Sequence, residues 1–252
     1  MSYGSTRIGI IGATSGYDAE AVSLDPSNGL RKTTPLDGIS DVGQGTISLW
    51  IKLNGSSSSS GRIFEVKSVV NGDDIIRFLE NRSFNTKLFQ LTISDGSTSL
   101  QIESTDTLTQ SDGWTHILMS WDVDAANGSK QMKLLKDGVD VTGTQNDTGD
   151  AFTMPLTTAL WHQLQVANFT HDIADFWFDT VYFDLTQSSN IKKFRNDDGK
   201  PVSLGTTGQL PTGSSPAIFF TGNKDEFVTN QGYGGAFTEL GTIEDATTSP
   251  SD

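Results

Sequence analysis

The sequence predicts an all-β chain folded as a two-sheet antiparallel sandwich. Apolar and polar residues alternate with the period of a strand over Thr46–Leu53, and short segments of the same kind recur along the chain. Asx-Gly turn signals separate these segments. The 252 residues include 26 glycines, a composition typical of strands joined by tight turns rather than of long helices.

The first clear strand begins at Thr46. Its odd-numbered residues form an apolar face: Ile47, Leu49, Ile51 and Leu53. Its even-numbered residues, Ser48, Trp50 and Lys52, form the opposite face. Successive side chains of a strand point to opposite sides, so this strand lies with one face in a core. The segment from Asn54 to Gly61, with five consecutive serines, is predicted to be a loop.

More strands are expected at short spacing after this loop. They are Arg62–Val70, Asp74–Leu79, Lys87–Ser94, Ser99–Glu103, Trp114–Trp121, Gln131–Lys136, Leu160–Ala167 and Asp175–Leu185. Turn signals between them are Asn71-Gly72, Asp95-Gly96, Asp112-Gly113, Asn127-Gly128 and Asp137-Gly138. Many short strands with this punctuation favour a sandwich or barrel over βαβ units.

The chain is predicted to divide into three parts. Residues 1–41 form an N-terminal arm, interpreted as a docking segment, and residues 42–186 form the sandwich core. Residues 187–252 form an extension packed on that core: a helical turn or two in Gln187–Arg195, a final strand in Ala217–Phe220, and a tail rich in Gly, Thr, Ser and Pro.

Charge and composition exclude several classes of function. The formal charge of −14 opposes binding to nucleic-acid phosphates. No apolar run has the length needed to cross a bilayer, and Met1–Arg7 lacks the features of a signal peptide. The absence of cysteine removes disulfides and thiolate metal sites. We therefore expect neither nucleic-acid binding nor membrane insertion.

Several segments together resemble the laminin-G-like branch of the concanavalin A-like jelly rolls. The most specific is the middle segment, Gly113–Asp122, and the resemblance extends over about Val42–Leu185. The other segments that carry it are Thr46–Trp50, Arg62–Val66, Lys136–Val139 and Asp175–Leu185. The resemblance implies a jelly-roll sandwich. Trp114 and Trp121 also have a purely structural explanation, because large aromatic residues anchor the cores of sandwiches of any topology.

The downstream stretch resembles the C-terminal extension of laminin-G-like proteins of tailed bacteriophages. The segments concerned are Arg195–Val202, Leu210–Gly213 and Gly232–Phe237. This resemblance implies a virion protein on the particle surface, as a tail-fibre or appendage subunit or a head decoration. The implied partners are other virion proteins, copies of the same chain and host-surface glycans. Two alternatives stay open: a secreted lectin-like carbohydrate-binding module and a polysaccharide-degrading enzyme.

A carbohydrate site needs an exposed aromatic ring beside polar groups. The candidates are Trp161 with His162, and Trp177 with Asp175 and Asp179. Burial in the core or in a subunit interface is the competing interpretation of both tryptophans. Glycosidases of this architecture place acid and nucleophile close together on one face, whereas Asp175 and Asp179 are four residues apart with Trp177 between them. We therefore expect no enzymatic activity.

Two further motifs are weighed against simpler explanations. Asp122, Asp124 and Asn127 offer oxygen ligands for calcium, although an Asp-Asn-Gly cluster is also the usual composition of a hairpin turn. The glycines of Ile8–Gly16 resemble a dinucleotide-binding loop, but that loop requires a βαβ unit that the rest of the chain does not predict. Calcium is thus the one candidate cofactor.

Overall fold

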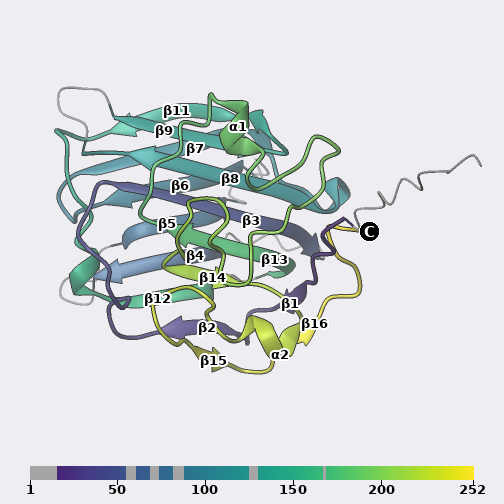
Figure 1. Ribbon diagram of the computed structural model, residues 1–252. Helices are drawn as coiled ribbons and strands as arrows, with labels where there is room; N and C mark the ends of the chain where they lie inside the picture. The colour runs from purple at the N-terminus through teal and green to yellow at the C-terminus, as the bar shows by residue number, and fades with distance from the viewer. Residues whose placement is uncertain (1–15, 55–60, 69–73, 82–87, 125–129, 167–168) are drawn as a thin grey trace, which may run out of the picture.

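The computed structural model confirms the all-β sandwich. It describes residues 16–54, 61–68, 74–81, 88–124, 130–166 and 169–252. Two antiparallel sheets stack face to face (Figure 1). The described helices are short: α1 (Ser188–Ile191), α2 (Lys224–Phe227) and two 3-10 turns, Gln110–Asp112 and Leu156–Thr158. None of the helices in this part of the chain is long and apolar enough to span a bilayer.

One sheet, called sheet A, is built around the strand β3 that the alternation predicts. Its strands in spatial order are β10 (Val139–Asp140), β9 (Gln131–Lys136), β8 (Thr115–Asp122), β3 (Gln44–Asn54), β13 (Thr170–Asp179), β1 (Val22–Leu24) and β16 (Glu244–Asp245). Beside β1, a short strand β14 (Ile218–Phe220) also pairs with β13. Asp137 and Gly138 connect β9 to β10 with φ angles of 52° and 78°, the positive values that a two-residue hairpin turn requires.

The other sheet, called sheet B, also has eight strands. In spatial order they are β11 (Thr142–Asp147), β7 (Ser99–Thr107), β6 (Leu88–Ser94), β5 (Asp74–Asn81), β4 (Gly61–Ser68), β12 (Ala159–Val166), β2 (Gly29–Lys32) and β15 (Thr238–Leu240). The inner faces of the two sheets form the main core. Trp121 lies in this core, fully buried, with its ring stacked at 6.4 Å from that of Phe178.

The segment predicted as an N-terminal arm contributes a strand to each sheet. β1 pairs with β13 in sheet A, and β2 pairs with β12 in sheet B. Residues 22–32 are therefore part of the sandwich. Residues 1–15 lie outside the described part of the chain, as do the predicted serine-rich loop over 55–60 and the turns at Asn71-Gly72 and Asn127-Gly128.

A second, smaller core lies on the outer face of sheet A. After β13 the chain leaves the sheet at Asp179, and the segment between β13 and β14 passes in front of β3 and β13 (Figure 1). Trp177 is buried there among apolar side chains of both the sheet and this segment: Leu118, Leu135, Phe183, Leu185, Phe194, Leu204 and Phe219. The extension predicted for residues 187–252 thus packs on the sandwich, and its short strands β14, β15 and β16 join the sheets.

Candidate functional site

Trp161 and His162 point to opposite sides of sheet B. Trp161 is half-buried on the outer face, where the Arg31 guanidinium carbon lies 3.8 Å from the centre of its ring. His162 is fully buried in the sandwich. Burial, and then the positive charge of Lys32, lower the pKa of His162 to about 4. Because neighbouring residues of a strand face opposite ways, these two candidates do not share a site.

The other three predicted sugar-contacting residues lie beneath the surface on β13. Trp177 is fully buried, and its indole N–H donates to the carbonyl oxygen of Gly208 at 2.9 Å. Asp179 accepts hydrogen bonds from the amide of Ala217 at 3.3 Å and the hydroxyl of Tyr233 at 3.5 Å. Burial raises the pKa of Asp179. In this arrangement the Trp177 ring has no face open to a sugar.

Asp175 is the extra residue of a β-bulge. The pairing of β13 with β3 shifts between Ala174 and Trp177, and Asp175 has a φ of 48°. Its buried carboxyl accepts hydrogen bonds from the hydroxyls of Tyr17 at 2.8 Å and Thr221 at 2.6 Å. Burial raises its pKa to about 6, although both hydrogen bonds act in the opposite direction. The bulge therefore places this carboxyl inside the molecule.

Two of the three predicted calcium ligands are adjacent. Asp122 accepts a hydrogen bond from the side-chain amide of Gln44 at 3.0 Å, and Asp124 accepts one from the backbone N–H of Gly43 at 3.4 Å. A hydrogen bond with Asp122, together with burial and the charge of Asp122, raises the pKa of Asp124. Asn127 lies outside the described residues. Among the residues that are described, no three His, Cys, Asp or Glu side chains are grouped as a metal site, so calcium binding stays a prediction.

A hollow of about 420 Å³ opens on the outer face of sheet A beneath residues 246–252. We call it the tryptophan hollow and define it by Trp50, Lys52, Trp114, Lys200 and Thr248, all of which line it. Trp50 and Lys52 come from the outer face of β3, and Trp114 directly precedes β8. Trp114 is half-buried, whereas Trp50 is only 3% exposed. The hollow therefore combines a partly exposed indole with a buried one.

Hydrogen bonds hold the polar groups of the tryptophan hollow in place. The hydroxyl of Thr248 accepts from the Trp114 indole N–H at 3.1 Å and from the Lys52 ammonium at 2.8 Å. The Lys200 ammonium donates to the backbone carbonyl oxygens of residues 250–252. Behind the hollow, the rings of Trp50 and His116 are 4.9 Å apart, and Ser48 lies 2.9 Å from His116 Nε2. Trp114 is thus held by Thr248, and Trp50 packs against His116.

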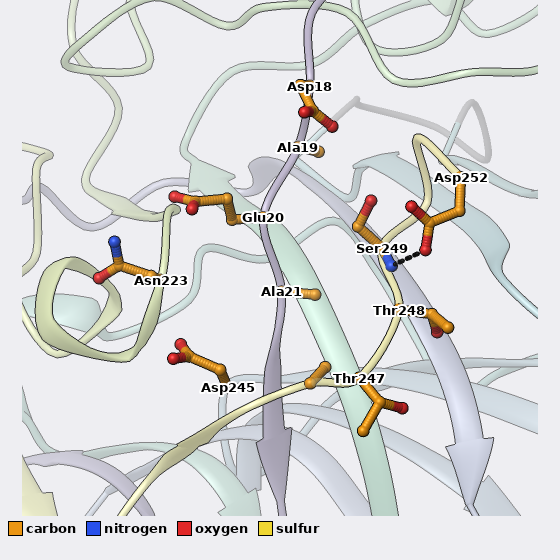
Figure 2. A pocket seen from close by; sticks show the side chains of 11 residues that line it. Asp18, Ala19, Glu20, Ala21, Asn223, Asp245, Thr247, Thr248, Ser249 and Asp252 are labelled. Carbon is orange, nitrogen blue, oxygen red and sulfur yellow. Dashed lines mark hydrogen bonds between the residues drawn. The ribbon is translucent and has the colours of Figure 1, made fainter.

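Two further hollows adjoin this one. The first has about 390 Å³, and its lining includes the carboxylates of Asp18, Glu20, Asp245 and Asp252. Figure 2 shows Glu20, Asn223 and Asp245 on one side of residues 18–21 and Thr248, Ser249 and Asp252 on the other. The second, about 530 Å³, lies between Tyr17, Lys200 and Asp252. Together these hollows form a broad polar depression around residues 246–252.

This arrangement has the chemistry of a sugar-binding surface. An indole ring stacks on the apolar face of a pyranose, while ammonium, hydroxyl and carboxylate groups around it exchange hydrogen bonds with the sugar hydroxyls. Strand alternation places Trp50 opposite the core residues Leu49 and Ile51, and it places Trp114 on the same face as His116. What the sequence does not reveal is that β3 lies beside β8, or that residues 246–252 return to this face.

Solved structures similar to this chain include the following two. A Bacteroides ovatus protein to which carbohydrate binding is ascribed is 8% identical, with a TM-score of 0.59, and the match covers 92% of this chain and 61% of that one. Domains LG4-5 of the mouse laminin α1 chain are 14% identical, with a TM-score of 0.48 and coverages of 68% and 45%. This chain therefore spans less than two thirds of either protein. No curated protein matches the sequence.

The sequence comparison with protein families gives a direct match. Residues 28–162 fit the laminin G model described as the concanavalin A-like lectin/glucanases superfamily. The match begins just before β2 and ends within β12, so it includes one strand, β2, that the resemblance at Val42–Leu185 did not cover. Since it covers more than half of the 252 residues, this chain belongs to the concanavalin A-like lectin/glucanase superfamily.

Proposed function

We propose that this chain is a non-enzymatic carbohydrate-binding domain that binds sugar in the tryptophan hollow. The observation that carries the proposal is the half-buried indole of Trp114, held by Thr248 beside the ammonium groups of Lys52 and Lys200. The ascribed role of the Bacteroides ovatus protein, which shares the fold, supports the same function. The Thr248 hydroxyl and the Lys52 ammonium would donate hydrogen bonds to sugar hydroxyls, and Trp114 would supply the stacking surface. Lys200, whose three N–H groups donate to the carbonyl oxygens of residues 250–252, would hold the rim of the hollow in place.

We propose further that the domain is a structural component of a tailed-bacteriophage virion, displayed on the particle as a tail-fibre or appendage subunit or a head decoration. The resemblance of Arg195–Val202, Leu210–Gly213 and Gly232–Phe237 supports this placement. In the structure, residues of these segments contribute to the layer over sheet A: Arg195 pairs with Pro201, and Leu210 donates to the carbonyl oxygen of Leu204 at 2.9 Å. Many copies on one particle would turn weak sugar binding into firm host attachment.

The sugar-binding proposal is tested by Trp114→Ala. Glycan-array screening of the wild-type protein would identify a ligand, and calorimetry would then compare the variants. We expect Trp114→Ala to weaken binding about tenfold or more, because the stacking surface is lost. Trp114→Phe, which keeps an aromatic face, should retain most of the affinity. Leu210→Ala, a change at a 62% exposed apolar side chain outside the hollow, serves as the control. Equal affinity of Trp114→Ala and wild type would contradict the proposal.

The position of the acidic residues of β13 supports the proposal of a non-enzymatic role. Asp175 is 2% exposed and Asp179 6% exposed, and both accept hydrogen bonds from the protein itself. A measurement of reducing ends released from the polysaccharides that the array identifies should give none. Release of reducing ends that disappears in Asp179→Asn would favour the polysaccharide-degrading alternative.

Assembly separates the virion proposal from a free-standing lectin. Deletion of the first forty residues would remove β1 and β2 from the sheets, so a docking role of the N-terminal segment is tested by deleting residues 1–15 alone. We expect light scattering to give a defined oligomer for the full chain and a smaller species for the truncated one. A monomer in both forms would contradict self-assembly through this segment.

A further inference from the structure

The outer face of sheet B carries a continuous row of polar side chains. One residue from each of six neighbouring strands lies directly opposite the next in the register. The row consists of Arg31, Gln163, Glu65, Arg77, Thr92 and Gln101. With strands about 4.8 Å apart, it is about 24 Å long. Glu65, Gln163 and Thr92 are 2%, 6% and 8% exposed, so the middle of the row is recessed, and the charged side chains of this face are unevenly distributed.

The cations of this face lie nearer to solvent than its carboxylates. Arg62, Lys67 and Arg77 have side chains 31%, 29% and 26% exposed, whereas those of Glu65 and Asp74 are 2% and 18% exposed. Glu65 pairs with Arg62 and Lys67, and Asp74 pairs with Arg62, Lys67 and Arg77. Two carboxylates thus hold three cations in fixed positions, with a net positive charge facing outward.

Arg31 and Trp161 extend this cluster across β2 and β12. The Arg31 guanidinium lies over the Trp161 ring and donates through Nε to the Gln163 side-chain oxygen at 2.9 Å. Trp161 is directly opposite Lys67 in the register, so the indole lies beside the cation cluster. The combined surface, which we call the cationic row, consists of Arg31, Arg62, Lys67, Arg77 and Trp161. Glu103, on β7, lies beyond its far end.

We propose that the cationic row binds an acidic polysaccharide whose sugar units carry carboxylates. The argument is charge complementarity: on a chain of net charge −14, four cations that outnumber two recessed carboxylates form a local region of opposite sign. Guanidinium groups pair with carboxylates in a forked geometry. The cationic row spans the four neighbouring strands β2, β12, β4 and β5, about 14 Å at the usual strand spacing, so it can contact more than one sugar unit.

A nucleic acid fits the same surface less well. The described part of the row contributes a single indole, Trp161, whereas single-stranded nucleic acids stack on successive aromatic side chains. The cationic row also lies on the sheet opposite the tryptophan hollow, so this site is independent of the proposed function.

The test measures binding of polygalacturonate, with neutral dextran of matched length and single-stranded DNA as comparison polymers. The intact protein should bind polygalacturonate in preference to both, and the affinity should fall as salt is added. Arg31→Gln combined with Lys67→Gln should weaken binding about tenfold, because Arg62 still neutralises Glu65 in this variant and the fold is retained. Trp161→Phe should preserve the fold and most of the affinity.

The matched control is Lys133→Gln combined with Lys192→Gln, which removes two cations from exposed ion pairs elsewhere on the surface. This control should bind polygalacturonate as the wild type does. Equal losses in both double variants would overturn the proposal, since total charge alone would then explain the binding. Equal or tighter binding of DNA would overturn it as well. Trp114→Ala should leave polygalacturonate binding unchanged, which separates this site from the tryptophan hollow.

Discussion

At the scale of single residues, Asp175 carries the least favourable conformation and charge in β13. It is a non-glycine residue with a positive φ, and it is 2% exposed. Both features cost free energy unless the surroundings compensate. The hydroxyls of Tyr17 and Thr221 supply that compensation. Because Tyr17 precedes β1 and Thr221 follows β14, this one carboxyl joins segments more than two hundred residues apart.

We expect Asp175→Asn to stabilise the protein at pH 7.5. The folded-state pKa of about 6 lies above the ordinary 3.8, so the folded state holds the proton more tightly than the unfolded state. The ionised carboxyl therefore lowers the free energy of unfolding above pH 6, on the order of 3 kcal/mol. Asparagine tolerates the positive φ and still accepts both hydrogen bonds.

Urea unfolding of Asp175→Asn and wild type at pH 7.5 and pH 4 checks this expectation. The difference in unfolding free energy should be largest at pH 7.5 and shrink toward pH 4, where the wild-type carboxyl is protonated. Asp198→Asn, at an exposed position, should show no such difference. A variant less stable than wild type by the same amount at both pH values would show that the charge itself does not destabilise the fold.

The sequence predicts candidate residues better than it predicts their exposure. Trp161 and Trp177 both fit a sugar site by residue type, but only Trp161 is partly exposed. The difference arises because residues 183–219, which follow Trp177 in the chain, fold back over it. Trp114 shows the converse: from the sequence it is interpreted as part of the family motif or as a core anchor, and not as a sugar contact. The Lys52 and Thr248 that complete its surroundings come from far along the chain.

At the scale of secondary-structure elements, strands with regular alternation were predicted well. β9 coincides with the predicted Gln131–Lys136. The predicted strand Asp175–Leu185 is displaced, because the strand runs from Thr170 to Asp179 and its bulge interrupts the alternation. The short strands β1, β2, β15 and β16 have two to four residues each, too few for a periodic signal. Only their pairing with other strands defines them.

Close packing between β3 and β8 makes one glycine of β3 indispensable. Gly45 lies opposite Trp121 in the register, and a Cβ at this position would overlap the Trp121 ring. Because Trp121 is fully buried and stacked on Phe178, the ring cannot move without disturbing the core. We expect Gly45→Ala to lower the unfolding free energy by about 1–3 kcal/mol, measured by urea denaturation.

The control for this variant is Gly16→Ala. An added Cβ at Gly16 meets no atom within 4 Å, so its stability should match that of the wild type. Equal stability of Gly45→Ala and Gly16→Ala would mean that β3 and β8 can separate at Gly45 without cost.

At the scale of the whole molecule, the three buried histidines should make the fold sensitive to acid. Burial is the main factor that lowers the pKa values of His116 and His171 to about 3, and that of His162 to about 4. These side chains stay neutral in the folded state, whereas the unfolded chain takes up protons below about pH 6.5. Stability is therefore full above pH 6.5 and is lost progressively toward pH 4.

We expect the urea midpoint to fall steadily between pH 7 and pH 5. Each histidine should lower the unfolding free energy by about 2 kcal/mol at pH 5, and the opposite effect of Asp175 should offset only part of this. His116→Gln removes one of the three buried histidines, so it should make the pH dependence of the unfolding free energy shallower by about a third. The ring that it replaces has its main polar contact with Ser48. A midpoint that does not change between pH 7 and pH 5 would contradict this account.

β1 and β16 pair side by side in sheet A. Close to this pair, residues 19 and 251 are in contact, because the backbone N–H of Ala19 donates to the Ser251 hydroxyl at 2.8 Å. In an antiparallel pair the first residue of one strand lies beside the last residue of the other. A force that pulled on residues 19 and 251 would therefore break the β1–β16 contacts one at a time, instead of shearing them together. Under tension, the domain should open first at this seam, beside the tryptophan hollow, while β3, β8 and β13 keep their pairing.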